Sequence, residues 1–210
     1  MTTRGAVLRP YRPADRDRVA LVCTLTGDAG GDATGRFADD GLLPHLYALP
    51  HVDFQPDLAT VVEIDGEVQG YVLGVSDVAA FSRWWASEWA PVLRRRFPAP
   101  GSWPDAQRQL LEGALDGSHL WSPLRVDHPA EFHVDLLPDA QGLGLGRGLV
   151  ERFCSQVRAR GAPGIAIGVD ARNTNAVDFY RHLGLEVLDT RREDGRPVGH
   201  TLGLRLVGTD

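Results

Sequence analysis

Cysteine is scarce in this chain, and the two cysteines present do not suit a disulfide scaffold. Cys23 and Cys154 lie far apart, whereas small secreted disulfide folds carry cysteines at dense, even spacing. Each lies in a run typical of a helix, so we expect both thiols to be reduced and buried.

Long apolar runs are also missing. No stretch approaches the roughly 18 uncharged apolar residues that a membrane span needs, and residues 1–12 lack the apolar core of a signal peptide. We therefore expect a cytoplasmic protein with no membrane partner.

An excess of basic charge is the third absence. A net charge of -6 and a pI near 5.6 give no broad positive field, which argues against a nucleic-acid partner. The seven histidines form no metal-type pair on one helical face, and the cysteines have no near partner, so we expect no bound metal ion. A neutral, basic or small-molecule partner is favoured.

What the chain does contain fits one globular domain over residues 1–210. Hydrophobic residues make up 43% of it, enough to fill a sizeable core. Proline and glycine separate alternating strand-like and helix-like segments, which indicates a mixed α/β or α+β sheet flanked by helices. The Asp65-Gly66 dipeptide is favoured at tight turns and predicts a hairpin. We expect strands at residues 6–9, 59–64, 68–75, 131–137, 165–169, 185–188 and 200–206.

All five tryptophans lie between the third and fourth of the main strands, in residues 77–129. They are Trp84, Trp85, Trp89, Trp103 and Trp121. We expect this segment to be a partly helical insertion. Large aromatic side chains at helical spacing are most often core residues, and we expect that here, with Trp84 or Trp85 as the exceptions.

A glycine-rich turn, residues 141–146, directly follows a predicted strand and opens a predicted helix. Unpaired N–H groups and the helix dipole make such a place an anion site, and glycine lets the backbone approach a ligand closely. The nucleoside-triphosphate motif Gly-x-x-x-x-Gly-Lys is absent, and the dinucleotide motif Gly-x-Gly-x-x-Gly fails at Arg147. A pyrophosphate is therefore expected; the alternative is that the glycines only permit close packing.

Two motifs together resemble the GNAT acetyltransferase family. Residues 136–146 are similar to its pyrophosphate motif, Gln/Arg-x-x-Gly-x-Gly/Ala, and residues 173–185 to its second signature, Asn-x-x-Ala-x-x-Phe-Tyr-x-x-x-Gly-Phe, with Leu185 replacing the final aromatic. Residues 41–47, 70–77 and 89–91 resemble the acetyltransferase-like C-terminal domain of bifunctional O-GlcNAcases and its free-standing bacterial homologues. The resemblance implies a GNAT-like, mostly antiparallel sheet with helices on both sides and a helical insertion.

The resemblance also implies acetyl-CoA as cofactor and a set of residues that bind it. The strand at 131–137 would splay from its neighbour, so that an N–H near Leu136 faces the acetyl carbonyl as an oxyanion donor. The expected cofactor-binding residues are Leu136, Leu137, Gln141, Gly142, Leu143, Gly144, Leu145, Gly146, Arg147, Asn173, Phe179 and Tyr180.

Two catalytic residues are expected. Tyr180 occupies the position of the family's general acid, and a phenol with a reference pKa near 10 is protonated at neutral pH. Glu131, His133 and Asp135 share one face if their strand alternates regularly. We favour Asp135 as the general base, with Asp170 in reserve, although Asp170 also suits a turn.

These expectations together describe an N-acetyltransferase that moves acetyl from acetyl-CoA to a small-molecule or peptide amine. The alternatives are a non-catalytic acyl-CoA-binding module and a protein-interaction domain that works through its tryptophan-bearing insertion. The sequence leaves both a monomer and a homodimer open.

Overall fold

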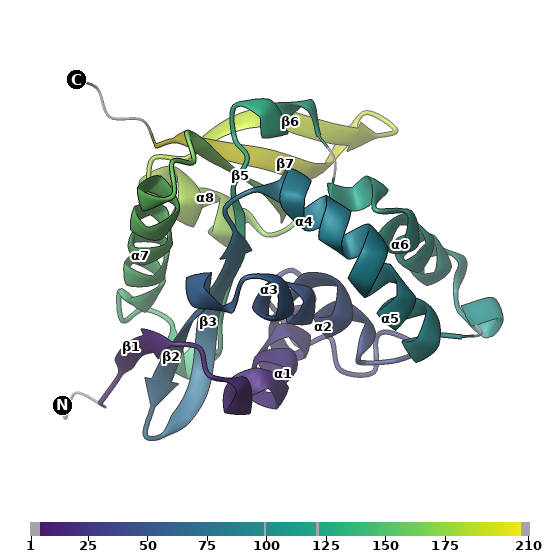
Figure 1. The fold of residues 1–210 in the computed structure, drawn as a ribbon, viewed down its shortest axis with the longest axis horizontal. Helices are drawn as coiled ribbons and strands as arrows, with labels where there is room; N and C mark the ends of the chain where they lie inside the picture. Colours follow the sequence, from purple (N-terminus) through teal and green to yellow (C-terminus); the bar gives the residue numbers. More distant parts are fainter. Residues whose placement is uncertain (1–4, 99, 121, 207–210) are drawn as a thin grey trace.

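Two antiparallel sheets form the frame of the computed structural model, which describes residues 5–98, 100–120 and 122–206 (Figure 1). The first has the order β1 (Val7–Pro10), β2 (Thr60–Ile64), β3 (Glu67–Val75), β4 (Glu131–Leu136); the second has the order β5 (Gly164–Asp170), β7 (Arg196–Arg205), β6 (Glu186–Glu193). The predicted mixed, mostly antiparallel sheet flanked by helices is confirmed.

Two hairpins end in the same kind of turn. Asp65 and Gly66 join β2 to β3 with φ of 54° and 84°, as the dipeptide predicts. Asp194 and Gly195 join β6 to β7 with φ of 49° and 76°, and this hairpin extends well beyond the short strands predicted at 185–188 and 200–206. Its outer part is polar and exposed, so no apolar run marks it in the sequence.

The two sheets meet at β4 and β5 and then separate. Ala130 forms a parallel bridge with Ile165: its N–H donates to the Gly164 carbonyl at 3.3 Å, and its carbonyl accepts from Ala166 N–H at 2.9 Å. This is the one bridge between them in the described residues. Beyond it the strands diverge, as the family resemblance implies, and leave a gap along β4.

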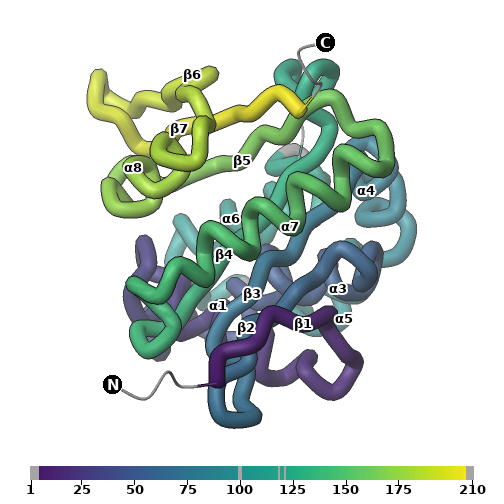
Figure 2. The backbone as a smooth tube through the Cα atoms, turned by 90° about the vertical axis from the view of Figure 1, so that its left-hand side faces the viewer, coloured from purple at the N-terminus to yellow at the C-terminus, as the bar shows by residue number. Residues whose placement is uncertain are grey.

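Helices cover both faces of the β1–β4 sheet (Figure 2). On one face lies α7 (Leu145–Ala159), which buries Leu149, Val150, Phe153 and Val157 because their spacing places them on one side of a helix. Phe153 meets Phe132 of β4 with ring centroids 5.3 Å apart. On the other face lie α1 (Arg16–Thr26), α2 (Leu42–Tyr47) and α3 (Leu49–Phe54). One further helix, α8 (Thr174–His182), precedes β6.

The segment between β3 and β4 is helical, as predicted. It contains α4 (Val78–Trp84), a π-helical turn (Trp85–Trp89), α5 (Ala90–Arg96), α6 (Asp105–Asp116) and short 3₁₀ turns. Trp85 is fully buried and donates its indole N–H to the Ala114 carbonyl at 2.6 Å, so it is a core residue and not the exception to core packing. Trp84 is half-buried, and Trp121 lies outside the described residues.

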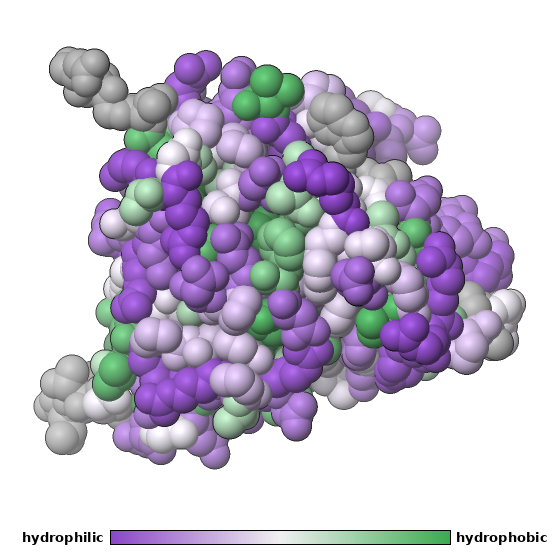
Figure 3. All heavy atoms as spheres, in the orientation of Figure 1, coloured by the Kyte–Doolittle hydropathy of each residue, from purple (hydrophilic) through white to green (hydrophobic). Residues whose placement is uncertain are grey.

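Surface and burial agree with the composition. No helix among the described residues is long and apolar enough to cross a membrane. Cys23 and Cys154 are free and buried, as expected. Figure 3 shows one face covered mainly by hydrophilic residues, with apolar side chains in small separate patches. The described residues of that face form no broad apolar surface of the kind typical of an interface.

Candidate active site

A cleft of about 1200 Å³ follows the gap between β4 and β5. Its walls come from α2, α3, β4, β5, the N-terminal end of α7, α8, the loop after α1, the insertion and the β6–β7 hairpin. Single small-molecule sites usually measure about 300–1,000 Å³. The cleft therefore has room for a long ligand and a second molecule beside it.

The backbone of β4 faces this gap at every second residue. Leu137 N–H donates to the Gln69 carbonyl at 2.9 Å, and Asp135 and His133 pair with β3 in the same register. Because antiparallel pairing alternates, the N–H groups of Phe132, Val134 and Leu136 point toward β5. The predicted donor Leu136 thus belongs to a row of three polar groups.

The glycine-rich turn leads from β4 into α7. Gln141 donates its side-chain N–H to the Leu136 carbonyl at 2.8 Å, which holds the turn against the strand. Gly142 and Gly144 have φ of 71° and 75°, and a Cβ on either would meet no atom within 4 Å. The first N–H groups of α7 have no helical acceptor, so the open space in front of them suits an anion.

Gly146 has a different role. A Cβ there would lie 3.2 Å from Phe179 Cζ and 3.4 Å from Leu136 Cδ1. Close packing, the alternative explanation of the glycines, therefore applies to Gly146, whereas ligand approach suits Gly142 and Gly144.

The other expected cofactor residues divide into two groups. Arg147 lies exposed at the start of α7, 3.5 Å from Glu151, and it lines the cleft together with Leu145, Asn173, Phe179 and Tyr180. Two do not line it: the side chain of Leu137 packs in the core beside α1 and α3, and Leu143 is 56% exposed outside the cleft.

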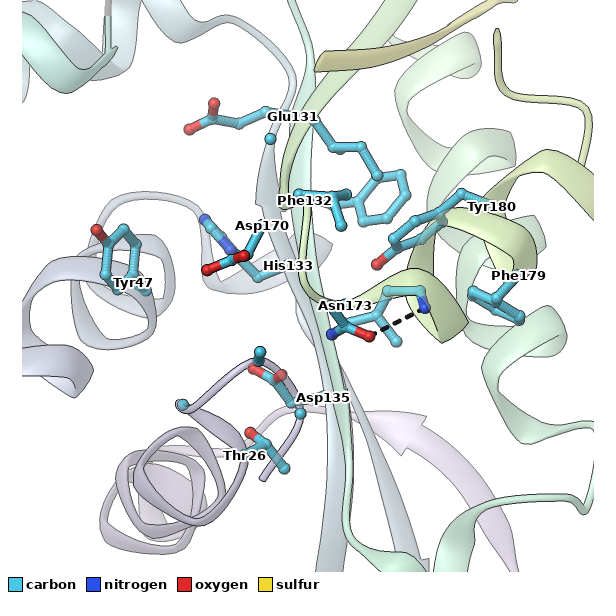
Figure 4. A pocket seen from close by; sticks show the side chains of 18 of the residues that line it. Thr26, Tyr47, Glu131, Phe132, His133, Asp135, Asp170, Asn173, Phe179 and Tyr180 are labelled. Atoms are coloured by element: carbon cyan, nitrogen blue, oxygen red, sulfur yellow. Dashed lines mark hydrogen bonds between the residues drawn. The ribbon is translucent and has the colours of Figure 1, made fainter. Parts of the chain in front are cut away.

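The α8 wall carries the expected acid. Asn173 caps α8 by accepting the Ala176 N–H at 3.1 Å (Figure 4), and Tyr180 points its hydroxyl toward the strands. Tyr180 is 7% exposed. Its pKa is raised by burial and then by the charge of Asp135, which keeps the phenol protonated at neutral pH.

Glu131, His133 and Asp135 lie on the opposite face of β4, as predicted (Figure 4). Burial opposes ionisation of Glu131, but His51 and Arg125 outweigh it and lower its pKa to about 2. Arg125 forms an ion pair with Glu131. Burial and then His51 lower the pKa of His133 to about 3, so this imidazole is uncharged at neutral pH.

Asp135 has the environment that a base needs. Tyr71, which is fully buried, donates its hydroxyl to Asp135 Oδ2 at 2.5 Å. Burial raises the pKa of Asp135 above the usual range, and hydrogen bonds from Tyr71 and Thr26 oppose that rise. A raised pKa makes the carboxylate a better proton acceptor near neutral pH.

Asp170, the reserve base, is held differently. It forms an ion pair with Arg172 at 2.8 Å and accepts the Arg172 backbone N–H at 2.8 Å. Hydrogen bonding from Arg172 lowers the pKa of Asp170. This is the turn role that the sequence also suggested, and it favours Asp135 as the base.

Sequence reasoning missed Tyr71, His51, Arg125 and Arg191, which contact or line the cleft. Tyr71 follows Gly70 inside an apolar strand, and His51 lies in a short helix without a motif. Arg191 lies on β6, and the Asp194-Gly195 turn was the signal that would have revealed that hairpin.

Comparisons with known proteins agree with this geometry. The family model described as the acetyltransferase (GNAT) family matches residues 36–185. The crystal structure of SsHAT is 32% identical, covers 97% of this chain and 99% of its own, and has a TM-score of 0.87. The structure of yncA from Salmonella typhimurium with acetyl-CoA is 18% identical, covers 98% of this chain and 96% of its own, with a TM-score of 0.56.

One curated relative is much longer than this chain. Protein O-GlcNAcase of Rattus norvegicus is 21% identical over 186 residues, which make up 87% of this chain and 20% of the relative. The chain thus spans about a fifth of the length of that relative, which agrees with the predicted resemblance to one domain of the O-GlcNAcases.

Proposed function

We propose that this chain, which belongs to the GNAT family of acetyltransferases, transfers the acetyl group of acetyl-CoA to an amine. Acetyl-CoA is the cosubstrate of the family. The observation that carries the proposal is the continuous path from the open N-terminus of α7, along the gap-facing N–H groups of β4, to Tyr180 and Asp135. The acceptor is a small-molecule or peptide amine.

The chain's own residues fit acetyl-CoA at both ends. The turn at Gly142 and Gly144 has open space and unpaired N–H groups for a pyrophosphate, with Arg147 as a nearby charge. The row of N–H groups on β4 suits the amides of a pantetheine arm. The bound cofactor supplies an activated thioester, and the N–H of Leu136 or its neighbour Val134 stabilises the developing oxyanion.

Tyr180 and Asp135 serve the two proton transfers. Asp135 accepts the proton that the attacking amine loses as its nitrogen bonds to the acetyl carbon. The carbon–sulfur bond then breaks, and Tyr180 donates its phenol proton to the departing thiolate. Both groups line the cleft from opposite sides, so acetyl transfer takes place between them.

The free, buried cysteines support a cytoplasmic location for the protein.

Calorimetric titration with acetyl-CoA tests the cofactor site. We expect saturable binding, and loss of at least 100-fold in affinity for Gly144→Glu, whose carboxylate would occupy the phosphate position. Gly161→Glu is the matched control because Gly161 also has positive φ and open space around it, at the other end of α7. Equal losses in both variants, or no binding by the native chain, would remove the proposal.

A second measurement separates the enzyme from a non-catalytic acyl-CoA-binding module. Thiol release over a broad panel of amines should rise above hydrolysis for at least one acceptor. Tight acetyl-CoA binding with no acceptor-dependent release over the whole panel would favour the binding module.

A further inference from the structure

Part of the cleft lies on the face of β4 that carries Asp135. We call it the inner pocket and define it by His51, His119, Arg125, Glu131 and His133, all of which line the cleft. These residues come from α3, from the 3₁₀ turns Ser118–Leu120 and Pro123–Val126, and from β4. The insertion thus encloses this part of the cleft together with α3.

His51 is an unusual residue for a buried position. Its side chain is 2% exposed, and neither ring nitrogen has a hydrogen-bond partner within the described chain. The nearest charged atom, Glu131 Oε1, lies 3.6 Å from Nε2, which is too long for a hydrogen bond. A buried polar group without a partner is costly, so a ligand that pairs with His51 gains affinity.

The one acidic side chain of the inner pocket, Glu131, is already engaged by basic groups. Glu131 forms an ion pair with Arg125, and Arg125 also donates to the Ala166 carbonyl at 2.8 Å. Burial lowers the pKa of both His133 and His119, so neither adds charge at neutral pH. A second ammonium on the acceptor would find no free carboxylate among these residues, and burying it would be unfavourable.

Hydroxyl groups match what the pocket offers. A hydroxyl both donates and accepts, so it can pair with either nitrogen of the uncharged His133 imidazole and with the unpartnered nitrogens of His51. The rings of His51 and His133 lie 4.9 Å apart at their centroids. Alternate residues of a strand are about 7 Å apart, so an amine at Asp135 places hydroxyls of a compact molecule beside His133 and His51.

We propose that the inner pocket binds the acceptor, and that the acceptor is a small amine whose other polar groups are uncharged hydroxyls, as in an amino sugar or amino alcohol. This inference rests on the proposed acetyl transfer and specifies its substrate class. His51 and His133 are its specificity-determining residues.

An acceptor panel tests the proposal. Glucosamine and ethanolamine are compared with putrescine, β-alanine, cyclohexylamine and Nα-acetyl-lysine amide, with thiol release as the readout. We expect kcat/KM for a hydroxylated amine to exceed that for each comparator by at least tenfold. Preference for putrescine, β-alanine, cyclohexylamine or the lysine derivative would overturn the inference and leave acetyl transfer intact.

Two variants of His51 test whether a preference for hydroxylated amines depends on the inner pocket. His51→Phe keeps the ring beside Phe81, 4.9 Å away, but removes both nitrogens, and should raise the KM for the hydroxylated amine about tenfold. His51→Gln restores a donor and an acceptor and should recover part of the loss. The exposed His182 of α8 lies outside the cleft lining, so His182→Phe is the matched control.

Acetyl-CoA affinity, measured by calorimetry in each variant, separates the possible failures. Unchanged acetyl-CoA affinity with unchanged KM in His51→Phe would overturn the acceptor inference alone. Failure of the native chain to bind acetyl-CoA would overturn the proposed function itself. If His51→Phe does not fold, the panel on the native chain still decides the substrate class.

Discussion

The two faces of β4 are built in different ways. One face carries Phe132, Val134 and Leu136 and lies toward α7. The residues expected to bind the cofactor on this side come from two short stretches of sequence. The other face carries Glu131, His133 and Asp135 and lies toward α1, α3 and the insertion. The partners of these side chains are distant in sequence; for example, Tyr71 precedes its partner Asp135 by 64 residues. One strand thus joins a site expected from two local sequence motifs to a polar site assembled from distant residues.

This difference predicts how substitutions on the two faces should affect the protein. The proposed cofactor side presents backbone groups, which every residue type supplies, and needs specific residues mainly where the backbone turns, as at Gly144. The proposed acceptor side presents side chains buried in contact with one another, so each partner affects the pKa of the next. Substitutions on the acceptor face should therefore affect chemistry and leave cofactor binding intact.

The largest effect is expected from Asp135→Asn. The amide still accepts the Tyr71 hydroxyl but cannot take a proton from the amine, so kcat should fall roughly 10²–10⁴-fold. Acetyl-CoA affinity should stay the same within about twofold. Thiol-release kinetics and calorimetry measure the two quantities. A retained kcat would assign the base to another group on this face.

Tyr180→Phe tests whether the cofactor wall also contributes chemistry. The ring keeps its packing against Phe132 and Phe179, but the thiolate loses its proton donor, so kcat should fall roughly 10²-fold. Tyr11→Phe, at a residue that does not line the cleft, is the matched control. If Tyr180→Phe weakens acetyl-CoA binding and leaves kcat unchanged, the residue is a packing residue only.

Tyr71→Phe should change the pH dependence of the reaction. Burial raises the pKa of Asp135, and the hydrogen bond from Tyr71 lowers it, so loss of the hydroxyl raises that pKa further. Activity that needs the carboxylate is lost as pH falls through its pKa, so the acid limb of kcat/KM should move to higher pH. Thr26 also faces this carboxyl, and Cys23 lies beside Tyr71.

The stability of the same variant provides a second check. Removal of a buried donor should lower the free energy of unfolding by about 1–3 kcal/mol at pH 7, measured by urea titration. If stability falls but the acid limb of the kcat/KM profile stays at the same pH, then Tyr71 has a structural role and does not influence the pKa of the base.

The smallest effect is expected from Gly146→Ala. The added methyl would press on Phe179 Cζ at 3.2 Å, shift a residue of the cleft wall, and weaken acetyl-CoA binding about threefold. Ser155→Ala, on an exposed position of the same helix, controls for the higher helix propensity of alanine. Equal acetyl-CoA affinity in both variants would show that Phe179 can shift to accommodate the methyl group without weakening acetyl-CoA binding.

Much of the cofactor side could be predicted because its signals are local. Residues 141–146 and 173–185 carry the turn, the cap and the aromatic pair within a few residues of each other. The side-chain directions of Leu137 and Leu143 could not be predicted in this way, because the direction of a side chain at a strand end or in a turn depends on what packs there: Leu137 faces the core beside α1 and α3, and Leu143 faces solvent.

The sequence by itself determined the alternation of strands and helices, the glycine turn at the start of α7, and the face shared by Glu131, His133 and Asp135, because each depends on backbone geometry and short-range spacing. Only the tertiary structure decided that Tyr71 holds Asp135 and that His51 and Arg125 surround Glu131. Those contacts join helices and strands far apart in the chain, and the pKa values they set depend on burial, which no local pattern contains.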